Sequence, residues 1–417
     1  MSRPRVLFLS HVLPQPPDGG VKIRTHHLLR ILARDFSVDA LCFFRQAARS
    51  DPGDIERAME ALEKYADHVE AFPIPQEEST VRLLWDHVRS TLRRRPYTVF
   101  SYESRRYLER LDDALERNSY DLVHVDSLDL SRYLEQISDV PVVCDHHNVE
   151  SELLRKRAES VGFPPTRMYL RMQADLLARE EEHWCPRVAL NVTVSERDRD
   201  SLSQRIPDAS YTVVPNGVDT EAFSPSEQER GDTESGLVFV GGCTWFPNRD
   251  ALEFFATDIL PIIREFRSDV RVRWVGRAEE NTLSHYSQKY GIEMTGYVDD
   301  IRPYVHDAAC YVVPIRVGGG TRLKILDAWA MGKAVVSTSQ GCEGLDARDG
   351  ENILIRDSSE GFAEAVDRVL SNGELRFRLG QEGRRTAERT YSWKVIGERM
   401  NAAYRRLLSA EDHAFES

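Results

Sequence analysis

Residues 314–334 read PIRVGGGTRLKILDAWAMGKA and place three glycines, an arginine and a lysine at the start of a predicted helix. Glycine lets the backbone approach a ligand closely, and the free N–H groups at a helix N-terminus favour an anion. Two cations at a helix end that usually carries acids cost a few tenths of a kcal/mol each. The pattern is typical of a phosphate site, although a surface turn with solvated basic side chains would also explain it. The predicted site comprises Gly318, Gly319, Gly320, Thr321, Arg322, Leu323 and Lys324.

Asp327 lies five residues beyond Arg322 on the same predicted helix, which ends at Gly332. One interpretation is an ordinary acid that stabilises the helix dipole. The other is a carboxylate that binds vicinal hydroxyls, as acids bind riboses beside phosphate-binding helices. The residues alone leave both interpretations open.

A second glycine-containing turn follows the first predicted strand, where Asp18, Gly19 and Gly20 open a helix. Either the glycines let the backbone close over a ligand, or they form a simple turn after proline. Arg24 lies one turn inside this helix. We expect its guanidinium to point either to a diphosphate or to solvent.

His146, His147 and Glu150 follow another predicted strand and superficially resemble a metal site. The sequence offers no second cluster at ligand spacing, so we predict no metal.

Short apolar runs that alternate with amphipathic stretches predict the elements that carry these residues. Strands at 5–10, 38–44, 121–127 and 141–147, with helices between them, indicate a parallel sheet covered on both faces. The alternation restarts after the polar segment 223–236, which we interpret as a linker. We predict an α/β fold of two doubly wound units, since ligands bind such sheets at the carboxyl ends of the strands. The predicted domains are 1–220, 221–392 and a C-terminal helix, 393–417, that packs back on the first domain.

Composition limits the function classes. The chain has 417 residues and a net charge of −13, which argues against nucleic acid as the main partner. No apolar run reaches the length needed to cross a bilayer, and the opening VLFLSHVL is interpreted as a buried strand rather than a signal peptide. The six cysteines are scattered and suit a reducing cytoplasm.

Residues 81–111 carry a positive charge within this acidic chain, because the segment contains eight arginines and only three acids. Aromatic residues lie among the arginines. Such a segment can rest on the inner face of the plasma membrane. A solvated helical face, or a loop that pairs with nearby acids, is the ordinary explanation of such a charge run. A site for an anionic acceptor, such as a lipid diphosphate or an acidic glycan, would explain it as well as a membrane does.

The sequence resembles the retaining GT-B glycosyltransferases of family 4 in five stretches. These are GGGTRLKILDAWAMGKAVVST at the predicted helix start, PNGVD at 215–219, FVGG at 239–242, DHHNVE at 145–150 and PPDGGVKIR at 16–24. It is similar to a branch with a GGGTRLK-type donor loop. The resemblance implies two Rossmann-like domains facing a cleft and no tightly bound metal or other cofactor. It also implies transfer of a sugar from a UDP- or GDP-linked donor with the anomeric configuration kept.

The family's signature is two glutamates eight positions apart. The second, which holds the donor ribose, matches Asp327, and the first falls on Gly319. The family also places an Arg and a Lys after the first strand of the second domain, where this chain has only Arg249. We infer that Arg322 and Lys324 take over the diphosphate role.

The resemblance nominates further residues by position. A histidine near the transferred sugar matches His147, whereas His146 packs or faces the acceptor. Gly241 and Gly242 would approach the phosphates, Tyr297 would line the nucleobase pocket, and Glu343 would bind the donor or cap a turn. The catalytic set is then His147, Arg322 and Lys324.

The leading hypothesis is a retaining glycosyltransferase that builds surface polysaccharide on a glycan or lipid-linked acceptor. No nucleophilic carboxylate is evident, which favours front-face displacement with the leaving diphosphate stabilised by the protein. The alternatives are a nucleotide-sugar epimerase and a non-catalytic nucleotide-sugar-binding partner of a transferase complex.

Overall fold

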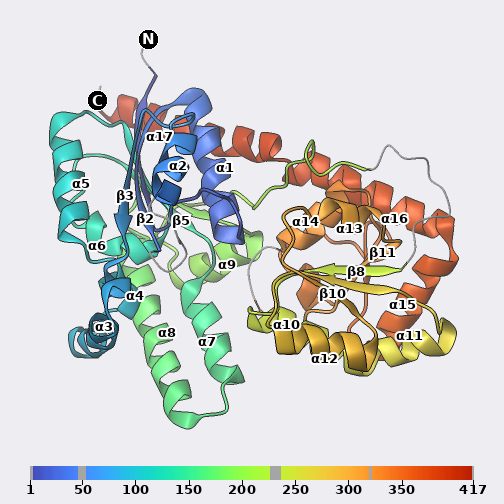
Figure 1. The fold of residues 1–417 in the computed structure, drawn as a ribbon. Coiled ribbons are helices and arrows are strands. Elements are labelled where there is room, and N and C mark those ends of the chain that lie inside the picture. The colour runs from blue at the N-terminus through green and yellow to red at the C-terminus, as the bar shows by residue number, and fades with distance from the viewer. Residues whose placement is uncertain (1–2, 46–52, 226–235, 319–321, 416–417) are drawn as a thin grey trace. The chain divides into compact units, whose positions relative to one another are not determined.

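The computed structural model describes residues 3–45, 53–225, 236–318 and 322–415, drawn as a ribbon in Figure 1. The chain forms two compact units. The first is Met1–Pro215 with Gly397–Ser417, and the second is Asn216–Ile396. The predicted boundaries at 220 and 392 lie within a few residues of this division, and the predicted linker falls largely on residues 226–235, outside the described residues.

The first unit is built on a seven-stranded parallel sheet in the order β3-β2-β1-β4-β5-β6-β7. The order of the strands reverses between β1 and β4, and such a switch point is where open α/β sheets bind ligands. The opening apolar run forms the central strand β1, whose residues after Arg5 are all buried. The strands are β1 (Arg5–Ser10), β2 (Ser37–Phe44), β3 (His68–Pro73), β4 (Leu122–Val125), β5 (Val142–His146), β6 (Leu190–Thr193) and β7 (Tyr211–Val213).

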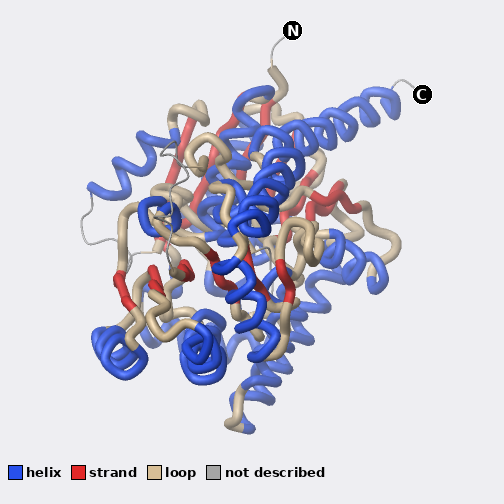
Figure 2. Tube along the Cα trace, turned by 90° about the vertical axis from the view of Figure 1, so that its right-hand side faces the viewer, coloured by secondary structure: helices blue, strands red, loops and turns tan. Residues whose placement is uncertain are grey.

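Helices cover this sheet, and Figure 2 shows them in blue around the red strands. Two of them, α7 and α8, run side by side as a hairpin (Figure 1). The helices of the unit are α1 (Gly20–Asp35), α2 (Gly53–Leu62), α3 (Thr80–Arg93), α4 (Tyr97–Ser101), α5 (Arg105–Arg117), α6 (Ser131–Leu134), α7 (Glu150–Ser160), α8 (Pro164–Trp184) and α9 (Glu196–Arg205).

The C-terminal helix α17 (Trp393–Phe415) contributes its later residues to the first unit. Tyr404 is fully buried, and its hydroxyl lies 2.6 Å from Nδ1 of His124 on β4. Asn401 donates a hydrogen bond of 2.6 Å to Asp35 at the end of α1. These contacts tie the end of the chain to the sheet that its beginning forms.

The second unit has a six-stranded parallel sheet in the order β10-β9-β8-β11-β12-β13. Its order reverses between β8 and β11, so those two strand ends define its switch point. The strands are β8 (Leu237–Val240), β9 (Val272–Val275), β10 (Glu293–Gly296), β11 (Cys310–Val313), β12 (Val335–Ser337) and β13 (Leu354–Ile355). The helices are α10 (Phe246–Phe254), α11 (Leu260–Phe266), α12 (Glu280–Tyr290), α13 (Arg302–His306), α14 (Leu323–Ala330), α15 (Ser359–Ser371) and α16 (Gly373–Thr386).

The two sheets confirm the predicted α/β fold of two doubly wound units. All six cysteines are buried, and none forms a disulfide. Among the described residues, no helix is both long and apolar enough to cross a membrane.

Candidate functional site

The helix predicted to bind phosphate is α14, which follows β11 at the switch point of the second unit. Its first turn has no acidic residue, and no side chain caps its N-terminus. In the loop before it, Gly318 has a φ of +120°, and a Cβ there would lie 3.3 Å from both Pro247 and Arg322. Glycine is therefore favoured at 318 by its backbone conformation, and a side chain there would also crowd its neighbours. Gly319, Gly320 and Thr321 lie outside the described residues, so their role stays a prediction.

Lys324 is the central side chain of this region. Its ammonium donates a 2.7 Å hydrogen bond to Oδ1 of Asn248 and lies 4.1 Å from the ring centroid of Phe239. No carboxylate of the described residues lies within ion-pair distance of the ammonium. Burial and the nearby Arg322 lower the pKa of Lys324 well below its usual value. An anion at this point would offset both effects.

Gly241 makes room for this ammonium. A Cβ on Gly241 would lie 2.8 Å from Nζ of Lys324 and 2.7 Å from Nδ2 of Asn248. The next residue, Gly242, accepts a 2.9 Å hydrogen bond from that amide group through its carbonyl. The turn after β8 and the start of α14 thus form one packed arrangement, and the approach of Gly241 and Gly242 to phosphates stays a prediction.

Arg322 is buried and donates to the main-chain carbonyl of Gln340 at 3.3 and 3.4 Å. Burial lowers its pKa to about 10, so it stays charged at neutral pH. Gln340 also donates to Gly318 O at 2.9 Å and to Oε2 of Glu343 at 2.6 Å. Gln340 therefore connects the glycine loop, Arg322 and Glu343.

Three other predicted residues of this unit have distinct surroundings. Asp327 is partly buried on α14, and burial raises its pKa to about 7, with Lys324 acting in the opposite direction. Tyr297 is 60% exposed, with the guanidinium of Arg277 5.0 Å from its ring centroid, a geometry that suits stacking by a flat ligand. Leu323 packs against the hydrophobic core.

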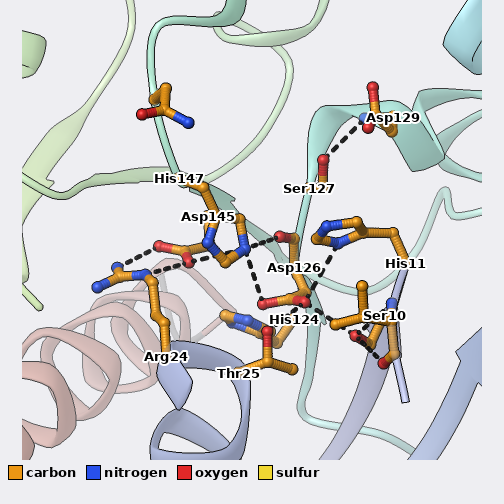
Figure 3. Close-up of polar contacts among 12 residues, drawn as sticks. Ser10, His11, Arg24, Thr25, His124, Asp126, Ser127, Asp129, Asp145 and His147 are labelled. Atoms are coloured by element: carbon orange, nitrogen blue, oxygen red, sulfur yellow. Dashed lines mark hydrogen bonds and ion pairs between the residues drawn. The ribbon is translucent and has the colours of Figure 1, made fainter. Parts of the chain in front are cut away.

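The first unit gathers a buried polar cluster where β1, β4 and β5 end (Figure 3). Asp126, directly after β4, is fully buried and lies between His11 and His147. Its Oδ2 accepts hydrogen bonds from Ser10 at 2.8 Å and Thr25 at 2.9 Å. Oδ2 is also 3.3 Å from Nδ1 of His11, and Oδ1 is 3.3 Å from Nε2 of His147.

Charge compensation controls protonation in this cluster. Burial alone would raise the pKa of Asp126, but His147 and His11 hold it far below its usual range. Burial alone would lower the pKa of His147, but Asp126 and then Asp145 raise it above its usual value. The carboxylate is ionised, and His147 readily carries a proton.

His11, Asp126 and His147 also have the composition of a metal site, with ligand atoms within 4.8 Å of one another. Nε2 of His147, however, lies 2.8 Å from the main-chain oxygen of Asp126, which can only accept a hydrogen bond. That nitrogen therefore carries a proton and has no lone pair for a metal. The geometry fits proton transfer or hydrogen bonding to a sugar better than ligation.

The structure corrects both expectations for Arg24. Its side chain is fully buried and donates to the two oxygens of Asp145 at 2.5 and 2.7 Å, and to Val214 O at 2.9 Å. It points neither to solvent nor to a ligand, because the buried carboxylate of Asp145 needs a counter-charge. His146 is buried and donates to Oδ1 of Asn191 at 2.9 Å, so it packs within the unit.

The turn at 18–20 has an open environment. Asp18 forms an exposed ion pair of 2.8 Å with Lys22. Gly19 precedes α1 in an extended conformation, and a Cβ there would meet nothing within 4 Å. Packing within the described residues therefore does not require glycine at 19, and the predicted approach of a ligand to Asp18, Gly19 and Gly20 stays a prediction.

Sequence reasoning missed Asp126, His11, Asn248 and Gln340 as members of these clusters. His11 directly follows the predicted strand 5–10 and Asp126 lies near the end of the predicted strand 121–127, and those positions were the available signal. Asn248 and Gln340 carry no comparable signal, since their importance comes from contacts with Lys324 and the glycine loop.

Comparisons with known proteins agree with this architecture. Residues 18–222 match the family model described as Glycosyltransferase Family 4, and residues 234–372 match the model described as Glycosyl transferases group 1. The lipopolysaccharide core biosynthesis glycosyltransferase LpsE of Rhizobium meliloti is 32% identical over 122 residues, which are 29% of this chain and 34% of LpsE. Spore coat protein SA of Bacillus subtilis is 23% identical over 330 residues, 70% of this chain and 86% of that protein.

A similar solved structure is HepE from Anabaena in complex with UDP. It has a TM-score of 0.65 and 14% identity, and the alignment covers 96% of this chain and all of HepE. At this identity the likeness concerns the fold. Since the two glycosyltransferase models occupy the two halves of one chain and the two doubly wound sheets match a GT-B enzyme, this protein is a glycosyltransferase of the GT-B fold.

Proposed function

We propose that the protein transfers a sugar from a nucleoside diphosphate donor, with retention of configuration, to a glycan or lipid-linked acceptor of a surface polysaccharide. The observation that carries the proposal is the partly buried ammonium of Lys324. Its nearest partners are a neutral amide and an aromatic ring, and no carboxylate of the described residues lies within ion-pair distance of it. With Arg322 and the N-terminus of α14, it forms a site for a leaving diphosphate.

Each residue then has a specific part in the reaction. Arg322 and Lys324 neutralise the charge that develops as the bond between the anomeric carbon and the diphosphate oxygen breaks. Asp327 binds the ribose hydroxyls, and Tyr297 stacks on the base. His147, protonated and held by Asp126, donates a hydrogen bond to the transferred sugar. The departing diphosphate accepts the proton of the acceptor hydroxyl as that oxygen bonds to the same face of the sugar.

The known relatives support the choice of donor and acceptor. HepE binds UDP, which favours UDP over GDP as the nucleotide. LpsE acts in lipopolysaccharide core biosynthesis, which favours a cell-surface glycan as the product. A lipid-linked acceptor would bring the enzyme to the inner face of the plasma membrane.

A thermal-shift panel of UDP-, GDP-, ADP- and dTDP-sugars tests the diphosphate site, since a ligand of the folded state raises its stability. We expect one nucleotide class to raise the melting temperature of the wild type and of Lys289→Ala, a change of an exposed lysine on α12. Lys324→Ala should lose this shift, because a hydrogen bond to a charged group is worth about 1.5–3 kcal/mol. Equal shifts in both variants would refute the assignment.

One observation favours an epimerase as second candidate. Two imidazoles share the carboxylate of Asp126, a group able to move protons. Incubation with the donor in D2O without acceptor separates the two functions. An epimerase forms a sugar epimer, with deuterium on carbon if it acts by proton exchange, whereas a transferase leaves the sugar unchanged until an acceptor is added.

A further inference from the structure

Helix α3 is amphipathic, but it packs on the first unit with its polar side inward. Asp86 and Ser90 are fully buried. On the opposite side, five apolar residues at positions i, i+3, i+4, i+7 and i+11 project into solvent, with 47–77% of their surface exposed. Apolar stripes of this spacing normally face the core. We call these five residues the apolar face of α3: Val81, Leu84, Trp85, Val88 and Leu92.

Specific polar contacts fix α3 in this orientation. Ser90 accepts a 2.7 Å hydrogen bond from Gln173 of α8 and donates one of 2.7 Å to Arg95 O. His87 lies 2.5 Å from the hydroxyl of Tyr169, also on α8. Figure 1 shows α3 beside α8. Rotating the helix to bury its apolar face would break these contacts, so the exposure is built into the fold.

Ion pairs also hold the side of α3 that faces the first unit. Asp86 lies 3.3 Å from Arg82 and 3.8 Å from Arg89, and Arg89 also pairs with Glu103 at 2.6 Å. The carboxylate that α3 buries is thus compensated by the cations of the same helix.

The structure also shows which arginines of the basic segment 81–111 form ion pairs with described residues and which do not. Five of its arginines are held in ion pairs, and Phe100 and Tyr102 are buried. Arg93 and Arg94, at the end of α3, are exposed and make no ion pair with a described residue. Arg94 keeps a side chain at a φ of +52°, where glycine would be less strained. The paired arginines are Arg82, Arg89, Arg95, Arg105 and Arg110.

We propose that the apolar face of α3 binds the surface of an anionic bilayer, with the helix lying in the plane of the headgroups. Interfacial helices combine a projecting apolar stripe with cations beside it. Here Arg93 and Arg94 flank the stripe, and Met168 on α8 is 72% exposed. This deepens the proposed function, on which it rests for a reason to visit a bilayer: the lipid-linked acceptor is found there.

A second copy of the chain fits this face less well. Both copies would carry a net charge of −13, and a two-fold contact would bring the same arginines near one another. The apolar residues project from a single helix. An anionic lipid surface complements the arginines directly.

Vesicle co-sedimentation of the full-length protein without nucleotide tests the proposal. The vesicles are phosphatidylcholine alone or with 30% phosphatidylglycerol, and we expect stronger binding to the anionic ones. Leu84→Gln/Trp85→Gln should weaken binding at least about tenfold, because two exposed side chains no longer enter the interface. Arg93→Gln/Arg94→Gln should reduce the preference for anionic vesicles. Phe266→Gln, a change of a 55% exposed residue of the second unit, should bind like the wild type.

Wild-type sedimentation with neither vesicle, or equal sedimentation of wild type and Leu84→Gln/Trp85→Gln, would overturn the proposal. A dimer in light scattering that this double variant dissociates, without vesicle binding, would assign the face to a second copy. Because Leu84 and Trp85 belong to the first unit and the proposed diphosphate site to the second, the nucleotide-induced thermal shift of the double variant should equal that of the wild type. Loss of vesicle binding would therefore overturn the membrane proposal without affecting the proposed function. Loss of the nucleotide-induced shift would overturn the proposed function without affecting vesicle binding.

Discussion

The substitution Gly241→Ala tests the arrangement around Lys324 most directly. It adds one methyl group at a point 2.8 Å from Nζ of Lys324, 2.7 Å from Nδ2 of Asn248 and 2.8 Å from Cε1 of Phe239. Contacts of a Cβ below 3.0 Å essentially never occur, so these groups must shift. Asn248 and Lys324 meet the added methyl group with the ends of flexible side chains, so we expect the ammonium and the amide to move away from their present positions.

Overpacking of this kind costs about 1–3 kcal/mol of folding free energy. For a unit of this size, each kcal/mol lowers the melting temperature by about 2–4 °C. Displacement of Lys324 also removes a charged hydrogen bond to the donor, worth about 1.5–3 kcal/mol. That loss corresponds to roughly 10- to 150-fold weaker binding of the nucleotide.

Differential scanning fluorimetry measures the first effect and isothermal titration calorimetry with UDP the second. The matched control is Gly373→Ala in the same unit, where a Cβ would meet only the guanidinium of Arg376 at 3.7 Å. We expect the control to melt and bind like the wild type. If Gly241→Ala did the same, Lys324 would not occupy the position described, and the diphosphate assignment would fail with it.

Three further outcomes follow from buried groups. Arg24→Met should cost about 3–5 kcal/mol in urea unfolding, because it removes the guanidinium that binds both oxygens of the buried Asp145 and leaves His147, at 3.9 Å, to offset that charge; a smaller loss would indicate that Arg24 is not structural. Burial raises the pKa of Asp327 from 3.8 to about 7. In that window the folded state keeps a proton that the unfolded state has lost, so stability falls as pH rises. Asp327→Asn should therefore flatten the loss of unfolding free energy between pH 5 and pH 8, and an unchanged slope would contradict this. Tyr404→Phe should destabilise the protein by about 1–3 kcal/mol in thermal unfolding, since it removes the 2.6 Å partner of His124, whose pKa burial lowers to about 4.

The fold could be predicted because buried parallel strands are continuous apolar runs. RVLFLS at 5–10 and CYVVPI at 310–315 both predict strands, and they form the central strands β1 and β11 with nearly those bounds. The edge strand β3, HVEAFP, was missed, since its alternating polar residues are only partly buried and leave no such run. The run DALEFFATDILPIIREF at 250–266 predicts a single helix after β8, whereas the structure has α10 and α11 separated by a π-helical turn at Phe255–Ile259.

The candidate site could be predicted only in part, because a sequence locates loops but not their contacts. Glycines and cations at 318–324 indicated an anion site without any partner. Asn248, which lies 76 positions from Lys324, could be found only from the packing. Arg24 shows the opposite error. Its position beside a glycine turn suggested a ligand, whereas burial of Asp145 required the same charge.

The polar clusters of the two units differ in how far their buried charges are compensated. In the first unit the buried carboxylates are already compensated, Asp145 by Arg24 and Asp126 by two imidazoles and two hydroxyls. Arg24 therefore has no positive charge to offer a diphosphate. In the second unit the ammonium of Lys324 has no carboxylate partner among the described residues, and its pKa is lowered. An incoming anion gains most from the cation whose burial is least compensated, which is why we propose that the diphosphate binds at α14. Donation of a proton or hydrogen bond to the sugar is the part that we propose for His147.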